Sequence, residues 1–241
     1  MEKIKTGIEK YFTLLRSVPS LVMTMFVVSV VLMNLLANKE IGLKVDWLAL
    51  DCGFTVSWLS FLCMDMLTKR FGAKAAIQLS LTAMLINLFV CGMLYLISLI
   101  PGNWGSFYDT GSDIANTALN NTIGGTWYVV LGSACAFATS SILNALLNEL
   151  IGKFCKKDNF VSYALRSYIS TLLAQFSDNF IFAMLVSRIF FGWSMVQVIT
   201  CSLTGCIVEL LCEVIFSPIG YRVCKRWDRD NVGADYLAQS I

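Results

Sequence analysis

Apolar residues fill six stretches of the chain, each long enough to cross a bilayer as a helix. A helix rises 1.5 Å per residue, so roughly 20 apolar residues cover a hydrocarbon core of about 30 Å. The pattern predicts spans at about residues 19–37, 47–67, 75–100, 126–150, 164–186 and 195–220. The connections between them are short, except for the segment 101–125, which is rich in Gly, Asn and Asp and predicts an irregular external loop.

The composition agrees with a chain that lies mostly inside a membrane. Of its 241 residues, 57% are hydrophobic and 14% are charged, whereas soluble domains average about 25% charged residues. We therefore expect an all-α integral membrane protein, with six transmembrane helices in one bundle and a single domain over residues 1–241. Residues 227–241 are polar and are expected to form a cytoplasmic tail that frays.

Lysine and arginine are distributed unevenly over the connecting segments. The N-terminal segment, the second and fourth connections and the C-terminal segment together hold fifteen of them. The remaining three are Lys39, Lys44 and Arg188. Because segments rich in Lys and Arg stay on the cytoplasmic side, this bias predicts a multi-pass protein of the inner (plasma) membrane, with both termini in the cytoplasm.

Asp178 lies near the middle of the fifth apolar stretch. A carboxylate at that depth costs about 2.5–3.5 kcal/mol on insertion scales, and it is retained only where it faces protein or a water-filled cavity. Gln175 and Asn179 come three residues before it and one after it, so a helix points all three side chains in neighbouring directions. We interpret this polar face as part of a binding site.

Other predicted spans also carry polar side chains. The further candidates for substrate binding are Asn38, Asp65, Asn144, Glu209 and Glu213. An Asn or Gln can also serve only to join helices, at about 0.6 kcal/mol per hydrogen bond. A buried carboxylate is harder to explain by packing alone, because a neutral group would join helices at a lower cost.

The predicted spans contain no deeply placed lysine or arginine. A bundle lined by carboxylates and amides favours a neutral or cationic ligand with many hydrogen-bond donors, and it disfavours an anion. Phe61, Phe176, Phe180 and Phe182 are available to stack against a flat ligand.

Two acids near the cytoplasmic ends of spans are each followed by a lysine four residues later. Asp65 precedes Lys69, and Glu149 precedes Lys153. Side chains at this spacing meet on one face of a helix. We therefore expect an ion pair within each of these two helices.

Four stretches of the chain resemble the queuosine-precursor transporters, also called the vitamin uptake transporter (VUT) family. The similarity extends over roughly residues 34–221. It is carried by Ala37-Asn38-Lys39, by Asp65-x-x-Thr68-x-x-Phe71-Gly72, by Ser170-Thr171-Leu172 with Gln175 and Asp178, and by Glu213 with Pro218 and Tyr221. Two positions differ from the family's pattern: Glu209 stands where a lysine is frequent, and Asn144 begins a stretch where Gln-x-x-Asp is usual.

The resemblance implies import of a queuosine precursor, such as 7-cyano-7-deazaguanine, its aminomethyl analogue or a related deazapurine. It implies a carrier and not an enzyme, so no catalytic residue, cofactor or metal is expected. The expected partners are this small molecule and the lipid bilayer, without nucleic acid, and a homo-oligomer is left open. The alternative is the substrate-binding subunit of an energy-coupling-factor type vitamin importer, which requires ATPase partners.

Overall fold

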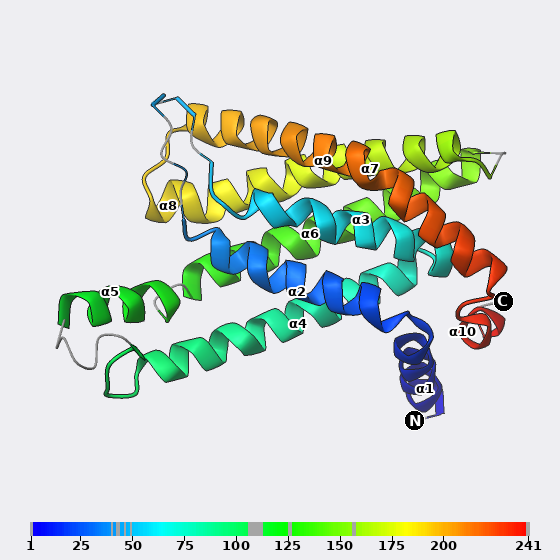
Figure 1. Ribbon diagram of the computed structural model, residues 1–241, viewed down its shortest axis with the longest axis horizontal. Coiled ribbons are helices and arrows are strands. Elements are labelled where there is room, and N and C mark those ends of the chain that lie inside the picture. Colours follow the sequence, from blue (N-terminus) through cyan, green and yellow to red (C-terminus); the bar gives the residue numbers. More distant parts are fainter. Residues whose placement is uncertain are drawn as a thin grey trace.

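The computed structural model describes residues 2–39, 41, 44–45, 47–48, 50–105, 113–124, 127–155 and 158–239. These residues are mostly helical (Figure 1). The helices are α1 (Glu2–Ser17), α2 (Ser20–Leu36), α3 (Phe54–Phe71), α4 (Ala73–Ser98), α5 (Asp113–Ile123), α6 (Trp127–Phe154), α7 (Phe160–Phe182), α8 (Arg188–Phe190), α9 (Met195–Arg229) and α10 (Ala234–Ala238), with a π-helical segment, Ala183–Ser187, between α7 and α8.

Six long helices, α2, α3, α4, α6, α7 and α9, form one bundle and run alternately in opposite directions (Figure 1). Helix α3 lies inside the bundle and packs against α2, α4, α6 and α9, while α7 packs between α6 and α9. We call the end where α3, α6 and α9 finish the terminal end, because α1 and α10 lie there. The end where α2, α4 and α7 finish is the opposite end.

Among the residues that the structure describes, four helices are long and apolar enough to cross a membrane: α4, α6, α7 with its continuation, and α9. A fifth crossing results if α1 and α2, which meet at a bend of 100°, count as one. Helix α3 carries Asp65, Lys69 and Arg70 within 18 residues. Residues 60–68 are all buried by the surrounding helices, so this helix does not need an apolar surface. The six-span count and the orientation stay predictions.

The predicted second span begins too early. Residues 47–67 were expected to be helical, but α3 begins only at Phe54. The backbone before it pairs with the beginning of the same connection, just after α2, where Ile41 N donates to Leu50 O at 2.7 Å and Cys52 N donates to Lys39 O at 2.8 Å. The chain then turns at Asp51, whose carboxylate accepts a 2.7 Å bond from Gly53 N.

The third connection was expected to be irregular, and α5 shows that this was wrong for residues 113–123. Asn116 accepts a 2.7 Å bond from Trp104 N and donates a 2.8 Å bond to Asn103. Asn120 accepts from the Trp104 indole. The amides that suggested a loop therefore fix a helix against the turn before it. Asp109 and Gly125, also in this connection, lie outside the described residues.

The polar tail was expected to fray, but it is ordered as far as Gln239. Trp227 and Tyr236 are 5% and 3% exposed and pack against Phe71. The ammonium group of Lys10 donates a 2.7 Å bond to the Gln239 carbonyl and lies over the Tyr236 ring. Aromatic packing and contacts with α1 thus hold the tail at the terminal end.

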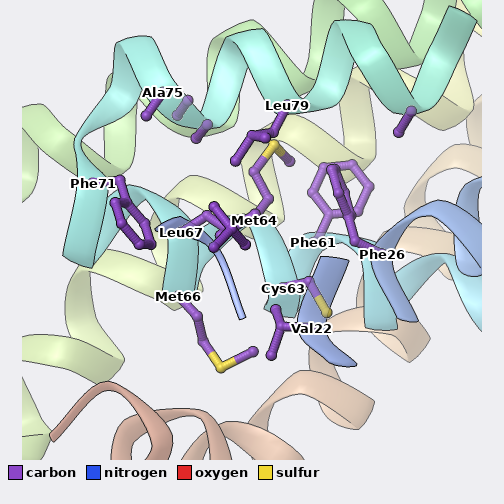
Figure 2. Close-up of a cluster of buried hydrophobic side chains, with 14 of the residues drawn as sticks. Val22, Phe26, Phe61, Cys63, Met64, Met66, Leu67, Phe71, Ala75 and Leu79 are labelled. Atoms are coloured by element: carbon purple, nitrogen blue, oxygen red, sulfur yellow. The ribbon is translucent and has the colours of Figure 1, made fainter. Parts of the chain in front are cut away.

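The apolar core lies between α2, α3 and α4. Figure 2 shows Val22 and Phe26 of α2, Phe61 and Met64 of α3, and Leu79 of α4 in one cluster. Phe61 and Met64 of α3 point toward α2 and α4, whereas Ser57 and Asp65 point toward α6, α7 and α9. This division places Ser57 and Asp65 in the polar interior of the bundle.

Ion pairs join three segments at the terminal end. Asp158, which precedes α7, bonds to Lys69 of α3 at 2.7 Å and to Lys225 of α9. The two expected intrahelical pairs therefore have different outcomes. Glu149–Lys153 is confirmed at 3.2 Å, but Asp65–Lys69 was wrong, because Lys69 turns outward to Asp158 while Asp65 is fully buried.

Candidate functional site

A small cavity lies inside the bundle among α2, α3, α6, α7 and α9, and we call it the central cavity. Its polar lining consists of Asn34, Asp51, Ser57, Ser133, Asp178, Asn179 and Glu209. The space open to the centres of water-sized molecules is about 30 Å³. A single water needs about 10–15 Å³, so the cavity as it stands holds two or three waters and no larger ligand.

The two candidate acids of the central cavity are held differently. Glu209 is 2% exposed, and its two oxygens accept bonds from the Ser57 hydroxyl and from Asn179 Nδ2, the latter at 3.0 Å. Asp178 is only partly buried, and its Oδ1 accepts a 2.7 Å bond from the Ser140 hydroxyl. Both oxygens of Glu209 thus have a protein partner, whereas Asp178 presents part of its carboxylate to the cavity.

Glycine 205 allows Asn179 to reach Glu209. It lies one helical turn before Glu209 on α9, and a Cβ at this position would come within 2.8 Å of Asn179 Nδ2. Real Cβ atoms essentially never approach another atom this closely. The absence of a side chain at Gly205 thus leaves the space in which the amide of Asn179 sits.

A second polar cluster lies nearer the terminal end, and we call it the acid-pair cluster. It contains Asp65, Asn144, Ser167, Thr171 and Glu213. All five residues are 0% exposed. Asp65 accepts bonds from Asn144 Nδ2 at 2.7 Å and from the Thr171 hydroxyl at 3.2 Å, and the Ser167 hydroxyl lies against both Asp65 and Glu213.

Several buried polar atoms near the acid pair have no hydrogen-bond partner among the described residues. They are Asn144 Oδ1, Glu213 Oε2 and both polar atoms of the Gln175 amide. An unmade bond at a buried polar atom costs about 1–3 kcal/mol. The interior of this bundle therefore has spare capacity for polar partners.

A second hollow adjoins the central cavity at the opposite end. It is lined by Asn38, Ser187, Phe191 and Trp193 and shares Ala37, Asp51 and Phe182 with the central cavity. We call it the outer hollow. Since the two spaces have three lining residues in common, Phe182 stands at the boundary between them.

The predicted site residues therefore fall into separate places. Asp178, Asn179 and Glu209 meet in the central cavity, while Asp65, Asn144 and Glu213 meet in the acid-pair cluster. Asn38 lies in the outer hollow, and its amide donates to the Leu35 carbonyl at 3.1 Å. Gln175 is fully buried in α7, between the heights of Thr171 and Asp178.

Serines are the residues that sequence reasoning missed. Ser57, Ser140 and Ser167 each donate to an acid inside the bundle. A serine within an apolar helix usually bonds to its own backbone, so the type alone gives no signal. The available signal was position, because Ser140 and Asn144 share a face of α6, as do Ser167, Thr171 and Gln175 on α7.

The buried acids have no basic partner in the part of the chain that the structure describes. The ion pairs at the terminal end involve Asp158, Asp228, Glu149 and Asp230, and none reaches Asp65, Asp178, Glu209 or Glu213. The lining of the central cavity likewise contains no lysine or arginine among these residues. The site is thus rich in acceptors and suited to a ligand with several donors.

A helical bundle with apolar outer faces and a polar cavity inside defines the class: a multi-pass membrane protein with a site for a small molecule. Residues 51–223 match the family model described as "Putative vitamin uptake transporter", and because the match covers well over half of the chain, the protein belongs to this family. No curated protein and no solved structure matches the chain. The family supports transport of a small molecule across a lipid bilayer and favours a carrier over an enzyme.

Proposed function

We propose that the protein imports a queuosine precursor, either 7-cyano-7-deazaguanine, its aminomethyl analogue or a related deazapurine. The observation that carries this proposal is the lining of the central cavity, where carboxylates and amides converge without a basic side chain among the described residues. The membership in a family of vitamin uptake transporters supports a small organic substrate.

The hydrogen-bonding edge of a deazaguanine fits such a lining. Its ring N–H and exocyclic amino group present two donors side by side, and a carboxylate accepts two parallel N–H bonds with its two oxygens. Asp178 is the best acceptor in the cavity, because Glu209 already accepts from Ser57 and Asn179. Phe182 borders the same space and can stack against the flat ring.

The size of the central cavity requires a change of conformation. A bicyclic base cannot occupy a space that accommodates a few waters, so the structure corresponds to a closed state. In alternating access the site opens to one side of the membrane at a time. The outer hollow adjoins the cavity at the opposite end, and with both termini in the cytoplasm, as the loop charges predict, it is the route from outside.

The test combines binding with uptake. The purified protein is heated with 7-cyano-7-deazaguanine, its aminomethyl analogue, guanine and a panel of vitamins. A ligand that binds only the folded state stabilises it by about 2.7 kcal/mol at a hundredfold excess over its dissociation constant. We expect stabilisation by the deazaguanines. Stabilisation by a vitamin alone, or by none of the panel, contradicts the proposal.

Asp178→Asn tests the site within this experiment. The substitution removes a charged acceptor worth about 1.5–3 kcal/mol, so we expect binding to weaken about 10- to 150-fold while the folded protein is retained. Asp235→Asn, an exposed acid in α10, is the control. Unchanged uptake by a folded Asp178→Asn variant would remove Asp178 from the site. Uptake in a host without energy-coupling-factor ATPases excludes the binding-subunit alternative.

A further inference from the structure

The hydroxyl of Ser167 is shared by two buried acids. Its oxygen lies at hydrogen-bonding distance from Asp65 Oδ2 and from Glu213 Oε1. A serine hydroxyl has one hydrogen and can donate only once, although its oxygen can also accept. If Ser167 donates to one carboxyl group, the other must donate to Ser167, and a carboxyl group donates only when it carries a proton.

The remaining contacts show which acid carries it. Asp65 accepts two further bonds, from Asn144 Nδ2 and from the Thr171 hydroxyl, at 2.7 and 3.2 Å. Bonds of this kind stabilise an ionised carboxylate. Glu213 has less support, since its Oε2 is buried without a hydrogen-bond partner among the described residues. The arrangement is therefore a chain in which protonated Glu213 donates to Ser167, and Ser167 donates to ionised Asp65.

We propose that Asp65, Ser167 and Glu213 form a proton-binding site that couples proton movement to transport. One proton resides on Glu213 in the closed state. When the bundle opens toward the terminal end and water reaches the cluster, Glu213 releases the proton and the pair changes from one negative charge to two. The proposed coupling rests on the proposed transport function. The proposal that Glu213 binds a proton is independent of that function.

The site is separate from the central cavity. None of Asp65, Asn144, Ser167, Thr171 and Glu213 belongs to the lining of that cavity. Glu209, one turn along α9, is nevertheless close enough for the two regions to influence each other. Ligand in the cavity and proton in the cluster can thus be bound together, as cotransport requires.

The charged and titratable groups around the pair come from three helices. Tyr163 and Arg166 lie on α7 within one turn of Ser167, and Glu209 lies one turn from Glu213 on α9. On α3, Lys69 is engaged by Asp158, and α6 presents the uncharged Asn144 and Asn148. Arg166 is bonded to Asn148 at 2.7 Å. None of these groups forms an ion pair with Asp65 or Glu213 in the described structure.

Infrared spectroscopy of the purified protein tests the bound proton without any ligand. A protonated carboxyl group gives a C=O band that shifts when the sample is exchanged into D₂O. We expect Glu213→Gln to remove one such band at neutral pH. Because Glu209 is also buried, Glu209→Gln is the matched control and must retain the Glu213 band. A Glu213→Gln spectrum with all bands intact would overturn the proposal.

Ser167→Ala provides a second variant, in case Glu213→Gln does not fold. This substitution removes the hydroxyl that accepts the hydrogen bond from protonated Glu213, so the frequency of the Glu213 C=O band must change. An unshifted band in folded Ser167→Ala contradicts the proposed chain of bonds.

Coupling is measured in proteoliposomes with labelled 7-cyano-7-deazaguanine. We expect an inward proton gradient to accelerate uptake severalfold, a sodium gradient to have no effect, and Glu213→Gln to lose the response to pH. Stimulation by sodium and not by protons would identify the cluster as a metal-cation site and overturn the proposal. Absence of uptake under every gradient would count against the transport function, while the infrared band would still decide whether Glu213 holds a proton.

Discussion

Asp178 and Glu209 line the same cavity but differ in how accessible their carboxyl groups are to a ligand. Glu209 is enclosed by Ser57 and Asn179, and Gly205 leaves the space for that arrangement. Asp178 has a single serine partner and remains partly exposed. Glu209 therefore shapes the wall of the cavity, while Asp178 supplies the accessible acceptor.

The charge of Glu209 should determine which deazaguanine the protein prefers. A carboxylate near the ligand favours the cationic aminomethyl analogue over the neutral cyano compound. We expect Glu209→Lys to reduce uptake of the aminomethyl analogue at least tenfold relative to the cyano analogue, because it replaces an attractive charge with a repulsive one. The measurement is competition between the two compounds, with Glu209→Gln as an intermediate. An unchanged preference ends the idea.

For single residues, the sequence predicts which acids lie inside the bundle, but not which of them lie next to one another. Apolar surroundings identify Asp65, Asp178, Glu209 and Glu213, because burial follows from local hydropathy. Their separation into a cavity and an acid pair depends on which helices meet, and that is set by packing over distances the local pattern does not encode. Ser167 was missed for the same reason, since its importance comes only from its two neighbours.

Helix α7 changes its winding just beyond the site. The π-helical segment Ala183–Ser187 follows Phe182 directly and packs against α6. Such segments are uncommon and are frequent at functional sites. The fit is tight, since a Cβ on Gly132 of α6 would lie 2.2 Å from Val186 Cγ2. The position of Phe182 between the outer hollow and the central cavity thus depends on close contact between α6 and this segment.

Gly132→Ala should destabilise the protein by forcing Val186 aside. Overpacking of this kind costs about 1–3 kcal/mol, and we expect a lower melting temperature in detergent. Gly92→Ala is the matched control, because nothing lies within 4 Å of its Cβ and alanine favours a helix over glycine. Adding Val186→Ala should restore part of the loss. Equal stability of the two single variants would contradict the close contact.

The elements predicted from hydropathy agree with the structure where a span is bounded by clear polar residues. The first, third and sixth spans begin within two residues of α2, α4 and α9. The second span was misplaced because apolar residues before α3 bond elsewhere: Leu50 O accepts from Ile41 N, and Trp47 O accepts from the Thr200 hydroxyl. Helix α5 was missed because its asparagines, read as loop formers, bond to Asn103 and Trp104.

Different contacts close the bundle at its two ends. At the terminal end, Asp158 ties α3 and α9 together through Lys69 and Lys225. At the opposite end, the outer hollow reaches the boundary of the central cavity. Opening toward the terminal end must therefore break ion pairs, whereas opening toward the opposite end requires mainly that Phe182 and its neighbours move.

Asp158→Asn should loosen the terminal end. Hydrogen bonds from Lys225 and Lys69 lower the pKa of Asp158 below 3.8. Because the pKa of Asp158 is lower in the folded protein than in the unfolded one, the ionised group stabilises the fold at any pH above its unfolded-state pKa. This stabilisation is lost as the pH falls through its folded-state pKa. The exposed position limits it to about 1 kcal/mol or less. We expect a small drop in melting temperature at pH 7 that disappears well below pH 3.8.

High salt provides the control for this prediction, because screening weakens exposed ion pairs. The difference between the wild type and Asp158→Asn should shrink at high ionic strength. A difference that persists there would have to arise from something other than these ion pairs.

The orientation can be tested on the whole molecule. We expect a fluorescent protein fused after Ile241 to fluoresce and alkaline phosphatase at the same place to be inactive, because the fifteen basic residues predict a cytoplasmic C-terminus. A phosphatase inserted after Trp104 should be active. The reverse pattern would invert the orientation, and activity at both places would show an even number of spans between them instead of the predicted three.

At the largest scale, the class of protein follows from sequence because composition and charge bias are global properties. The order in which helices surround α3 does not follow from them. Apolar helix faces carry little information about their neighbours, since lipid and protein offer similar surroundings to a leucine. Hence Trp227 and Tyr236, assigned to a polar tail, pack against Phe71 in the structure.

The proton that Glu213 shares with Ser167 determines how much charge each transport cycle moves across the membrane. If one proton enters with each neutral deazaguanine and the carrier returns empty and unprotonated, each cycle moves one positive charge inward. A membrane potential of 100 mV, negative inside, then supplies about 2.3 kcal/mol per cycle, enough for about a 50-fold accumulation. Import would be electrogenic and would continue without a pH gradient as long as the voltage is maintained.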